Sequence, residues 1–81
     1  MRLDKFLKIS RIIKRRTIAA EACGKNRVFV NDRVAKSGHQ LKVGDIITIL
    51  FGTKPLSVEV LSLVEIPRQE PSEYLYRVIG T

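Results

Sequence analysis

Residues 2–22 read RLDKFLKISRIIKRRTIAAEA, and this stretch predicts two helices joined at a cluster of cations. In the first helix the apolar residues fall on one side of a helical wheel, a spacing typical of a helix that packs on a core. That side is formed by Leu3, Phe6, Leu7 and Ile13, with the small Ser10 among them. The opposite side is basic and consists of Lys5, Lys8, Arg11 and Arg15. We therefore expect one helix that covers a core and presents a basic stripe.

The end of this first helix is indicated by Lys14, which the same wheel would place on the buried side. Lysine is almost never fully buried without a partner, so we expect the helix to end or bend near Ile13. Asp4 lies in the first turn, where a carboxylate suits the positive end of the helix dipole. Its position alone therefore explains Asp4 as a helix-start residue.

The second helix is expected to begin after Thr17, because threonine is a favourable N-cap. Gly24 or Asn26 could supply a left-handed exit at its other end. The run KRR at residues 14–16 precedes this helix, whose start also offers unpaired N–H groups and a positive dipole end. These features predict a phosphate-binding site, with a plain solvated loop as the alternative. The short apolar face of the helix would consist of Ile18, Ala19, Ala22 and Cys23.

The rest of the chain predicts a small sheet. A short strand at 28–30 is followed by a tight turn at Asn31-Asp32, from which the chain returns through 34–35. A turn at 43–45 leads into a strong strand at 46–51, and residues 52–55 form a loop. Residues 56–66 alternate and predict a long strand. Residues 36–42 are a polar loop, residues 67–73 an irregular linker, and residues 74–79 a last strand or a short helix. The apolar face of the long strand would consist of Leu56, Val58, Val60, Val64 and Ile66.

Positive charge is concentrated in the first half of the chain. The 81 residues carry a net charge of +7. Residues 1–36 hold 11 Lys/Arg and 3 Asp/Glu, whereas residues 37–81 hold 4 Lys/Arg and 5 Asp/Glu. A basic excess on one part of a small domain favours a polyanionic partner, and nucleic acid is the leading candidate. A generic solubilising surface is the alternative, but it would not require so uneven a distribution.

The order of these motifs resembles a known family. RLDKFL, then SR, KRRT, RVFVN and VGDII are similar to the S-four RNA-binding domain, also called the αL motif. This resemblance implies an α+β fold with two or three N-terminal helices packed on a small, mostly antiparallel sheet. Asn26 and Asp32 stand where the family usually has glycine, and both residue types tolerate a positive φ. We expect residues 1–66 to form this domain and residues 67–81 to be an extension that can add a strand to the sheet.

A narrower resemblance covers residues up to about 66. The first helix together with FGTKPLSVEV at residues 51–60 resembles the RqcP (YabO) family, which is related to the fifteen-kilodalton heat-shock protein. It implies a cytoplasmic, non-enzymatic protein of bacterial ribosome quality control. Such a protein would bind large-subunit rRNA and peptidyl-tRNA on an obstructed large (50S) ribosomal subunit. It would support C-terminal alanine tailing by an RqcH-type tailing factor. A heat-shock-type factor that recycles free large subunits, or a general binder of structured RNA, is the alternative.

The RNA-contacting residues are expected on the helical half and on the hairpin that follows it. Arginine pairs bidentately with phosphate and stacks on bases, so it suits a folded RNA surface. Arg2 and Arg16 are the leading candidates because both match basic positions of the family motif. The expected set also includes Lys5, Lys8, Arg11, Lys14 and Arg15, with Arg27, Arg33 and Lys36 as further candidates.

Other functional classes are less well supported by the sequence. The single histidine, His39, has no companion ligands in sequence, so we expect no metal site and no cofactor. Cys23 lies in an expected helix without a nearby base and is expected to pack rather than react. A basic amphipathic helix could bind a membrane surface, but so small a domain needs its apolar face for the core. We therefore expect no membrane partner, and a monomer.

Overall fold

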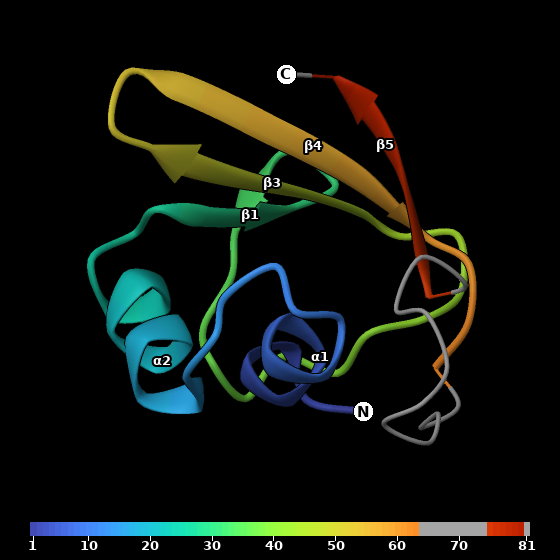
Figure 1. Cartoon of the computed structure of the whole chain (residues 1–81), viewed down its shortest axis with the longest axis horizontal. Helices are drawn as coiled ribbons and strands as arrows, with labels where there is room; N and C mark the ends of the chain where they lie inside the picture. Colours follow the sequence, from blue (N-terminus) through green and yellow to red (C-terminus); the bar gives the residue numbers. More distant parts are fainter. Residues whose placement is uncertain (64–74, 81) are drawn as a thin grey trace.

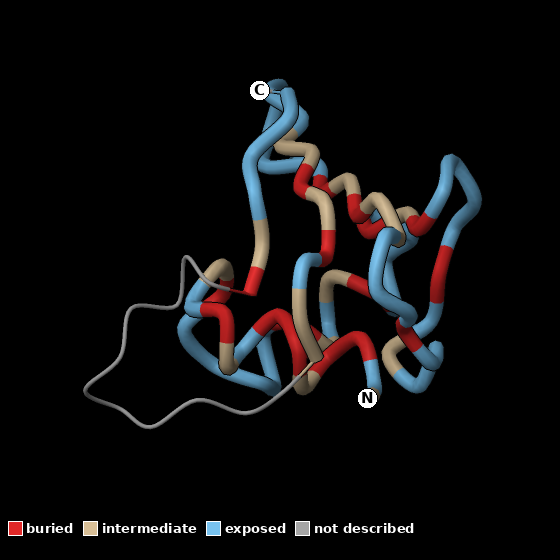
Figure 2. Tube along the Cα trace, turned by 90° about the vertical axis from the view of Figure 1, so that its right-hand side faces the viewer, coloured by how far each residue is buried: buried red, intermediate tan, exposed pale blue. Residues whose placement is uncertain are grey.

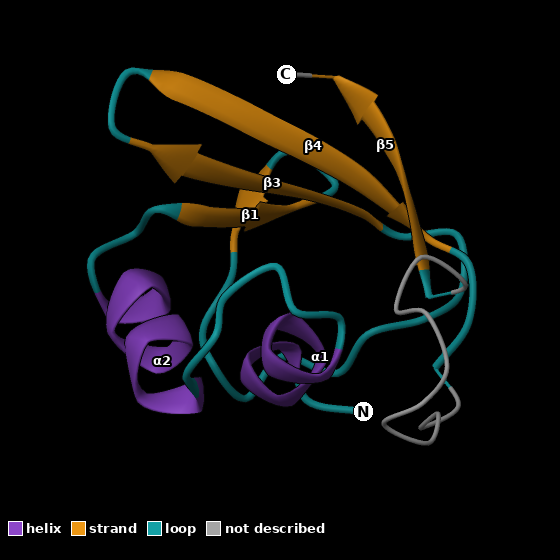
Figure 3. Cartoon of the chain, viewed as in Figure 1, coloured by secondary structure: helices purple, strands orange, loops and turns teal. Residues whose placement is uncertain are grey.

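The computed structural model describes residues 1–63 and 75–80, and it shows two helices packed on one side of an antiparallel sheet (Figure 1). The helices are α1 (Leu3–Ile9) and α2 (Arg16–Gly24). Figure 3 shows the same division into a helical layer and a sheet layer. The expected α+β class is thereby confirmed. The strands are β1 (Val28–Val30), β2 (Arg33–Val34), β3 (Ile46–Phe51), β4 (Lys54–Val60) and β5 (Tyr76–Gly80).

The five strands lie in the order β2-β1-β3-β4-β5, and every neighbouring pair is antiparallel. Strand β1 pairs with β3 through Phe29 opposite Thr48, and β3 pairs with β4 through Thr48 opposite Ser57. Because side chains alternate along each strand, these three residues share the face away from the helices. The opposite face carries the apolar side chains that the helices cover.

The core lies between the helices and that face of the sheet. Figure 2 shows the buried positions where the two layers meet. Phe6 is the largest fully buried side chain, and Leu3 and Leu7 are buried with it, which confirms the apolar side expected for the first helix over Leu3–Ile9. Ser10 is also buried, and its hydroxyl donates a hydrogen bond to the carbonyl of Leu7 at 3.3 Å. The sheet contributes Val28, Val30, Ile47, Ile49, Val58 and Val60.

Helix α1 ends at Ile9, so the prediction of an end near Ile13 is wrong by about one turn. The chain leaves the helix because Arg11 takes a left-handed φ of 63°, and its N–H donates to the carbonyl of Lys8 at 3.0 Å. A left-handed residue just beyond the last turn is a common way for a helix to end. Ile13 then turns back into the core from the connecting segment, while Lys14 is exposed.

Helix α2 begins at Arg16, with Arg15 as its N-cap, so the prediction of Thr17 as N-cap is wrong. Arg15 makes no side-chain capping bond, and its extended backbone (φ −123°) sets the start of the helix. The expected apolar face is confirmed for Ala19 and Cys23, whereas Ile18 is 49% exposed. The expected left-handed exit lies at Asn26, with a φ of 59°.

The first hairpin follows the sequence closely. Asn31 and Asp32 both have positive φ, at 52° and 67°, as a two-residue turn between twisted strands requires. Asn26 and Asp32 therefore adopt at the two family glycine positions the conformation that asparagine and aspartate tolerate. The returning strand is Arg33–Val34, one residue earlier than expected.

The second hairpin is tighter than expected, because β4 begins at Lys54 and only two residues form the turn. Pro55 therefore lies inside the strand, opposite Leu50. Strand β5 pairs with β4 only from Ser57 to Val60, so no described strand lies beside Pro55 on that side. The missing N–H of Pro55 therefore costs no hydrogen bond to β5. Strand β4 ends at Val60, and residues 61–63 are irregular, which shortens the long strand expected over 56–66.

The C-terminal segment pairs with the sheet. The last strand expected over 74–79 is observed as β5, Tyr76–Gly80, and Leu75 beside it is fully buried. Residues 64–66 of the expected long strand and the expected linker at 67–73 lie outside the described residues. The division into a domain of residues 1–66 and an extension therefore stays a prediction. No helix in the described part of the chain is long and apolar enough to cross a membrane.

Candidate RNA-binding surface

A buried carboxylate organises the two strongest RNA-binding candidates. The side chain of Asp4 is only 6% exposed, whereas those of Arg2 and Arg16 are 50% and 45% exposed. The Nε of Arg2 lies 3.2 Å from Oδ1 of Asp4, and the Nε of Arg16 lies 3.3 Å from Oδ2. One carboxylate thus joins the residue before α1 to the first residue of α2. We call Asp4, Arg2 and Arg16 the Asp4 cluster.

The charge of Asp4 is stabilised by its neighbours. Burial alone would raise the pKa of this carboxyl group, because a low dielectric disfavours the charged form. The hydrogen bonds and charge of Arg16, a hydrogen bond from the backbone N–H of Lys5 at 2.8 Å, and Arg2 outweigh burial and hold the pKa below its ordinary value. The carboxylate is therefore ionised at neutral pH, and it fixes both guanidinium groups at the surface.

Each arginine of the cluster still has donors for a ligand. The guanidinium group carries five N–H donors, and at most two of them on each arginine face Asp4. The donors that do not face Asp4 can bind phosphate, because the planar guanidinium group matches the spacing of phosphate oxygens. Arg2 is positioned further by the loop at 37–40, since Gln40 forms an isolated bridge with it and Gly38 lies beside its guanidinium.

The segment between the helices carries more of the expected set. Arg11, Lys14 and Arg15 are exposed there, and Lys8 is exposed in the last turn of α1. The left-handed turn at Arg11 places these cations on a connection rather than along one continuous helix, as the wheel had implied. Lys5 is half-buried on α1.

The three second-rank candidates do not join the Asp4 cluster as one group. Arg27 lies beyond α2 and lines an apolar hollow with Ile18 and Phe51. Lys36 is exposed and donates to Oδ1 of Asn26 at 3.4 Å. Arg33 lies on β2, where it borders a different hollow together with His39. The expected set therefore spans the helical layer and both of its flanks, and its contact with RNA stays a prediction.

The structure gives no support for a reactive cysteine or a metal site among the described residues. Cys23 is fully buried, and burial together with the charge of Asp4 raises the pKa of its thiol, which keeps it protonated. This agrees with the packing role expected for it. Within residues 1–63 and 75–80, no three His, Cys, Asp or Glu side chains form a group that could hold a metal ion.

Sequence reasoning missed the role of Asp4. Its place in the first turn gave it a sufficient explanation as a helix-start residue, so no partner was sought. A signal was present, because Asp4 is adjacent to Leu7 on the helical wheel and lies at the margin of the apolar side. A carboxylate at such a margin, within the most basic stretch of the chain, is a candidate for a buried ion pair.

Comparison with known proteins defines the class. The S4 domain family matches residues 1–47, which contain both helices, the first hairpin and the Asp4 cluster. The fold is also shared with two solved structures. Heat Shock Protein 15 of Vibrio cholerae superposes with a TM-score of 0.87 at 28% identity, covering 98% of this chain and 81% of that one. The protein HP1423, known from a solution structure, gives a TM-score of 0.81 at 26% identity, covering 100% of this chain and 99% of that one.

Closer relatives narrow the assignment. A protein of Halalkalibacterium halodurans named RQC P-site tRNA stabilizing factor is 51% identical over 96% of this chain and 89% of its own. The factor of the same name from Streptococcus pneumoniae is 49% identical over 99% of this chain and 91% of its own. That of Bacillus subtilis is 42% identical over 98% and 92%. The chain therefore belongs to the family of RQC P-site tRNA stabilizing factors within the S4 domain proteins, as its motifs indicated.

Proposed function

We propose that this protein is a non-enzymatic RNA-binding factor of ribosome quality control in the cytoplasm. It binds P-site tRNA and large-subunit rRNA on large ribosomal subunits that are obstructed by a stalled nascent chain. The observation that carries the proposal is the identity of 51% and 49% with factors named for stabilising P-site tRNA, over nearly the whole chain. The exposed cations of the helical layer also support the proposal, because they can bind the phosphates of a tRNA.

The Asp4 cluster supplies the mechanism. A flexible arginine must lose side-chain entropy when it binds phosphate, and Asp4 orders Arg2 and Arg16 before RNA arrives. RNA binding therefore costs less ordering at these two residues. Lys8, Lys14 and Arg15 add exposed cations around the cluster, so binding should weaken steeply with salt as counterions are released.

The protein acts with a tailing factor of the RqcH type as its partner. In this proposal it acts as a monomeric clamp that holds the peptidyl-tRNA while the partner adds C-terminal alanines. Catalysis then belongs to the partner and the ribosome, in keeping with the buried and protonated Cys23. Direct contact with the partner is not required by this mechanism, since both would bind the same subunit.

A second function is favoured by one observation, the TM-score of 0.87 to Heat Shock Protein 15. A factor of that type would recycle free large subunits that carry nascent chain-tRNA, without supporting tailing. A general binder of structured RNA would need neither the subunit nor the tRNA. The three functions differ in what they require from the cell, and this allows a direct test.

The test combines sedimentation with an assay of alanine tails. Tagged protein is sedimented through a sucrose gradient of cell lysate, and the RNA that migrates with it is sequenced. We expect the protein on free large subunits together with tRNA, and we expect alanine tails to disappear when its gene is deleted. Tails that persist after deletion would favour the recycling function. Absence of the protein from all ribosomal fractions would reject both ribosomal functions.

A further inference from the structure

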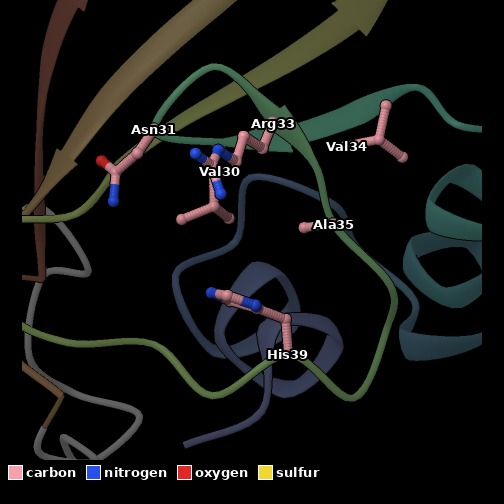
Figure 4. A pocket seen from close by; sticks show the side chains of 6 residues that line it. All are labelled: Val30, Asn31, Arg33, Val34, Ala35 and His39. Carbon is pink, nitrogen blue, oxygen red and sulfur yellow. The ribbon is translucent and has the colours of Figure 1, made fainter.

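A hollow of about 520 Å³ lies beside the first hairpin and is not used by the proposed clamp. It is bordered by the hairpin on one side and by the loop at 36–40 on the other (Figure 4). Figure 4 shows Arg33 and His39 on opposite sides of the hollow, with the side chain of Val30 between them. Its size falls within the range of small-ligand sites.

Two side chains at the hollow are available to a ligand. Arg33 and His39 are both exposed, and within the described residues neither side chain makes a hydrogen bond or an ion pair. The third polar side chain, Asn31, is already engaged. Its Nδ2 donates to Asp45 at 3.1 Å, and its Oδ1 accepts from the N–H of Ile46 at 3.0 Å. The side chain of Asn31 is therefore held in place by these two bonds, and Arg33 and His39 are the polar side chains that can bind a ligand.

The remaining wall is apolar. Val30 and Ala35 are 5% and 4% exposed, and Val34 lies beside them with 47% of its surface exposed. An aromatic ring and a guanidinium over an apolar floor match what an unpaired base and its phosphate need. Unpaired bases stack on histidine and arginine, and arginine also binds phosphate.

The loop that carries His39 is also bonded through its backbone to the start of the chain, where Arg2 lies. The carbonyl of His39 accepts from the N–H of Leu3 at 2.9 Å, and the next residue, Gln40, bridges to Arg2. One loop thus contributes His39 to the hollow and pairs with the backbone of Arg2. This shared loop links the hollow to the Asp4 cluster.

We propose that this hollow takes one unpaired nucleotide of the RNA that the helical layer binds. The base stacks on the His39 ring against Val30, and its phosphate binds Arg33. The proposal rests on the proposed function for its RNA, and it adds a site that reads single-stranded structure next to a clamp for phosphate. A free nucleoside monophosphate has the same chemistry, so the experiment must separate the two sources.

Four variants test the site by their affinity for purified large subunits that carry tRNA. His39→Ala should weaken binding about tenfold, as expected for loss of one stacked base, whereas His39→Phe keeps a ring and should bind nearly as well as wild type. Arg33→Gln should also weaken binding and should lower the dependence on salt by about one phosphate contact. Lys54→Gln is the matched control, because Lys54 is an exposed cation at the far hairpin.

Chemical probing of unpaired nucleotides supplies the second readout. We expect wild type to protect one unpaired nucleotide that remains reactive with His39→Ala. Unchanged affinity and unchanged protection with both His39→Ala and Arg33→Gln would overturn the proposal. Competition by adenosine monophosphate at the hollow would overturn the RNA source in favour of a free nucleotide. Arg16→Gln keeps the two proposals distinguishable, because it should weaken binding even if the hollow variants do not.

Discussion

Two regions of the molecule differ in where their charged and polar side chains lie. One is the helical layer with the first hairpin, residues 1–36, and the other is the outer sheet of β3, β4 and β5. The first region holds 11 of the 15 Lys and Arg residues, and Asp4 and Ser10, the buried polar residues among those described, both lie in it. In the outer sheet the polar pairs are Thr48 with Ser57 and Glu59 with Arg77, and none of these side chains is buried.

This difference teaches that the buried carboxylate lies beside two of the cations proposed to bind RNA. A carboxylate that is buried beside arginines is weak support for stability in itself, because desolvation offsets much of the attraction. Its value here is the fixed position of two cations that face solvent. The outer sheet, by contrast, is stabilised by apolar burial and by ordinary cross-strand pairs. Changes in the two regions should therefore separate stability from RNA binding.

The largest expected effect is on the shared core. Phe6→Ala should lower the free energy of unfolding by about 3–5 kcal/mol, because it removes a fully buried ring and leaves a cavity. Phe51→Ala is the matched control, since Phe51 is 45% exposed, and it should cost less than about 1.5 kcal/mol. Thermal and urea unfolding measure both. Equal losses would mean that the two phenylalanines are not differently buried.

The next effect should come from Asp4→Asn. We expect a loss of about 1–3 kcal/mol in the free energy of unfolding, typical of a hydrogen bond to a charged group. RNA affinity should fall as well, because Arg2 and Arg16 lose their anchor. Asp32→Asn is the control, as Asp32 is exposed in the first hairpin turn. A variant that lost stability and kept full RNA affinity would contradict the positioning role.

Acid should remove the same contribution. The pKa of Asp4 is lowered in the folded state, so its stabilising effect is complete above the unfolded pKa of about 3.9 and is lost as pH falls through the folded pKa. The stability difference between wild type and Asp4→Asn should therefore be constant near neutrality and shrink below about pH 4. Urea unfolding at a series of pH values measures the difference, and an undiminished gap at pH 3 would disagree.

A smaller effect on stability, with a clear effect on binding, is expected from Arg16→Ala. Binding to large subunits should weaken about tenfold, in line with the loss of one charged contact. The domain should remain folded, because Arg16 is half exposed and Arg2 still pairs with Asp4. Lys54→Ala is the control, because Lys54 is an exposed cation outside the proposed RNA-binding set. A large drop in melting temperature would assign Arg16 to the fold rather than to the RNA.

The smallest effect is expected in the outer sheet. Glu59→Gln removes an ion pair with Arg77 in which the arginine is 65% exposed. Such pairs contribute about 0–1 kcal/mol, and this one lies away from the helical layer. Stability should change little and RNA affinity not at all. An affinity change as large as that of Arg16→Ala would contradict the expectation that RNA binds to the helical layer and not to the outer sheet.

Sequence patterns predicted the elements whose reasons are local. Val28–Val30 and Ile46–Phe51 were predicted because β-branched runs bounded by turn residues rarely form anything else. The Asn31-Asp32 turn followed from the tolerance of both residues for positive φ. The apolar side of α1 followed from its spacing, and its three predicted residues within the helix, Leu3, Phe6 and Leu7, are buried.

The misses share one cause, which is that tertiary contacts decided the local outcome. Arginine gives no hint of a left-handed conformation, so the end of α1 at Arg11 could not be read from its residue type. Thr17 was a better N-cap than Arg15, yet α2 starts two residues earlier than a Thr17 cap implies, at Arg16, which contacts Asp4. Of the site, the sequence predicted the cations, whose contact with RNA stays a prediction, but not the carboxylate that pairs with Arg2 and Arg16.

The tie between the start of the chain and the loop at 37–41 has a consequence for synthesis. The N–H groups of Leu3 and Asp4 donate to the carbonyls of His39 and Ser37, and the carbonyl of Met1 accepts from Leu41. The seven residues of α1 are too few to form a stable helix alone. Because residues 1–9 are made before the loop at 37–41, they wait for about forty later residues, some seconds at ordinary elongation rates, before Arg2 takes its place. A nascent copy of this protein cannot clamp RNA on the ribosome that is making it until its first strands have emerged.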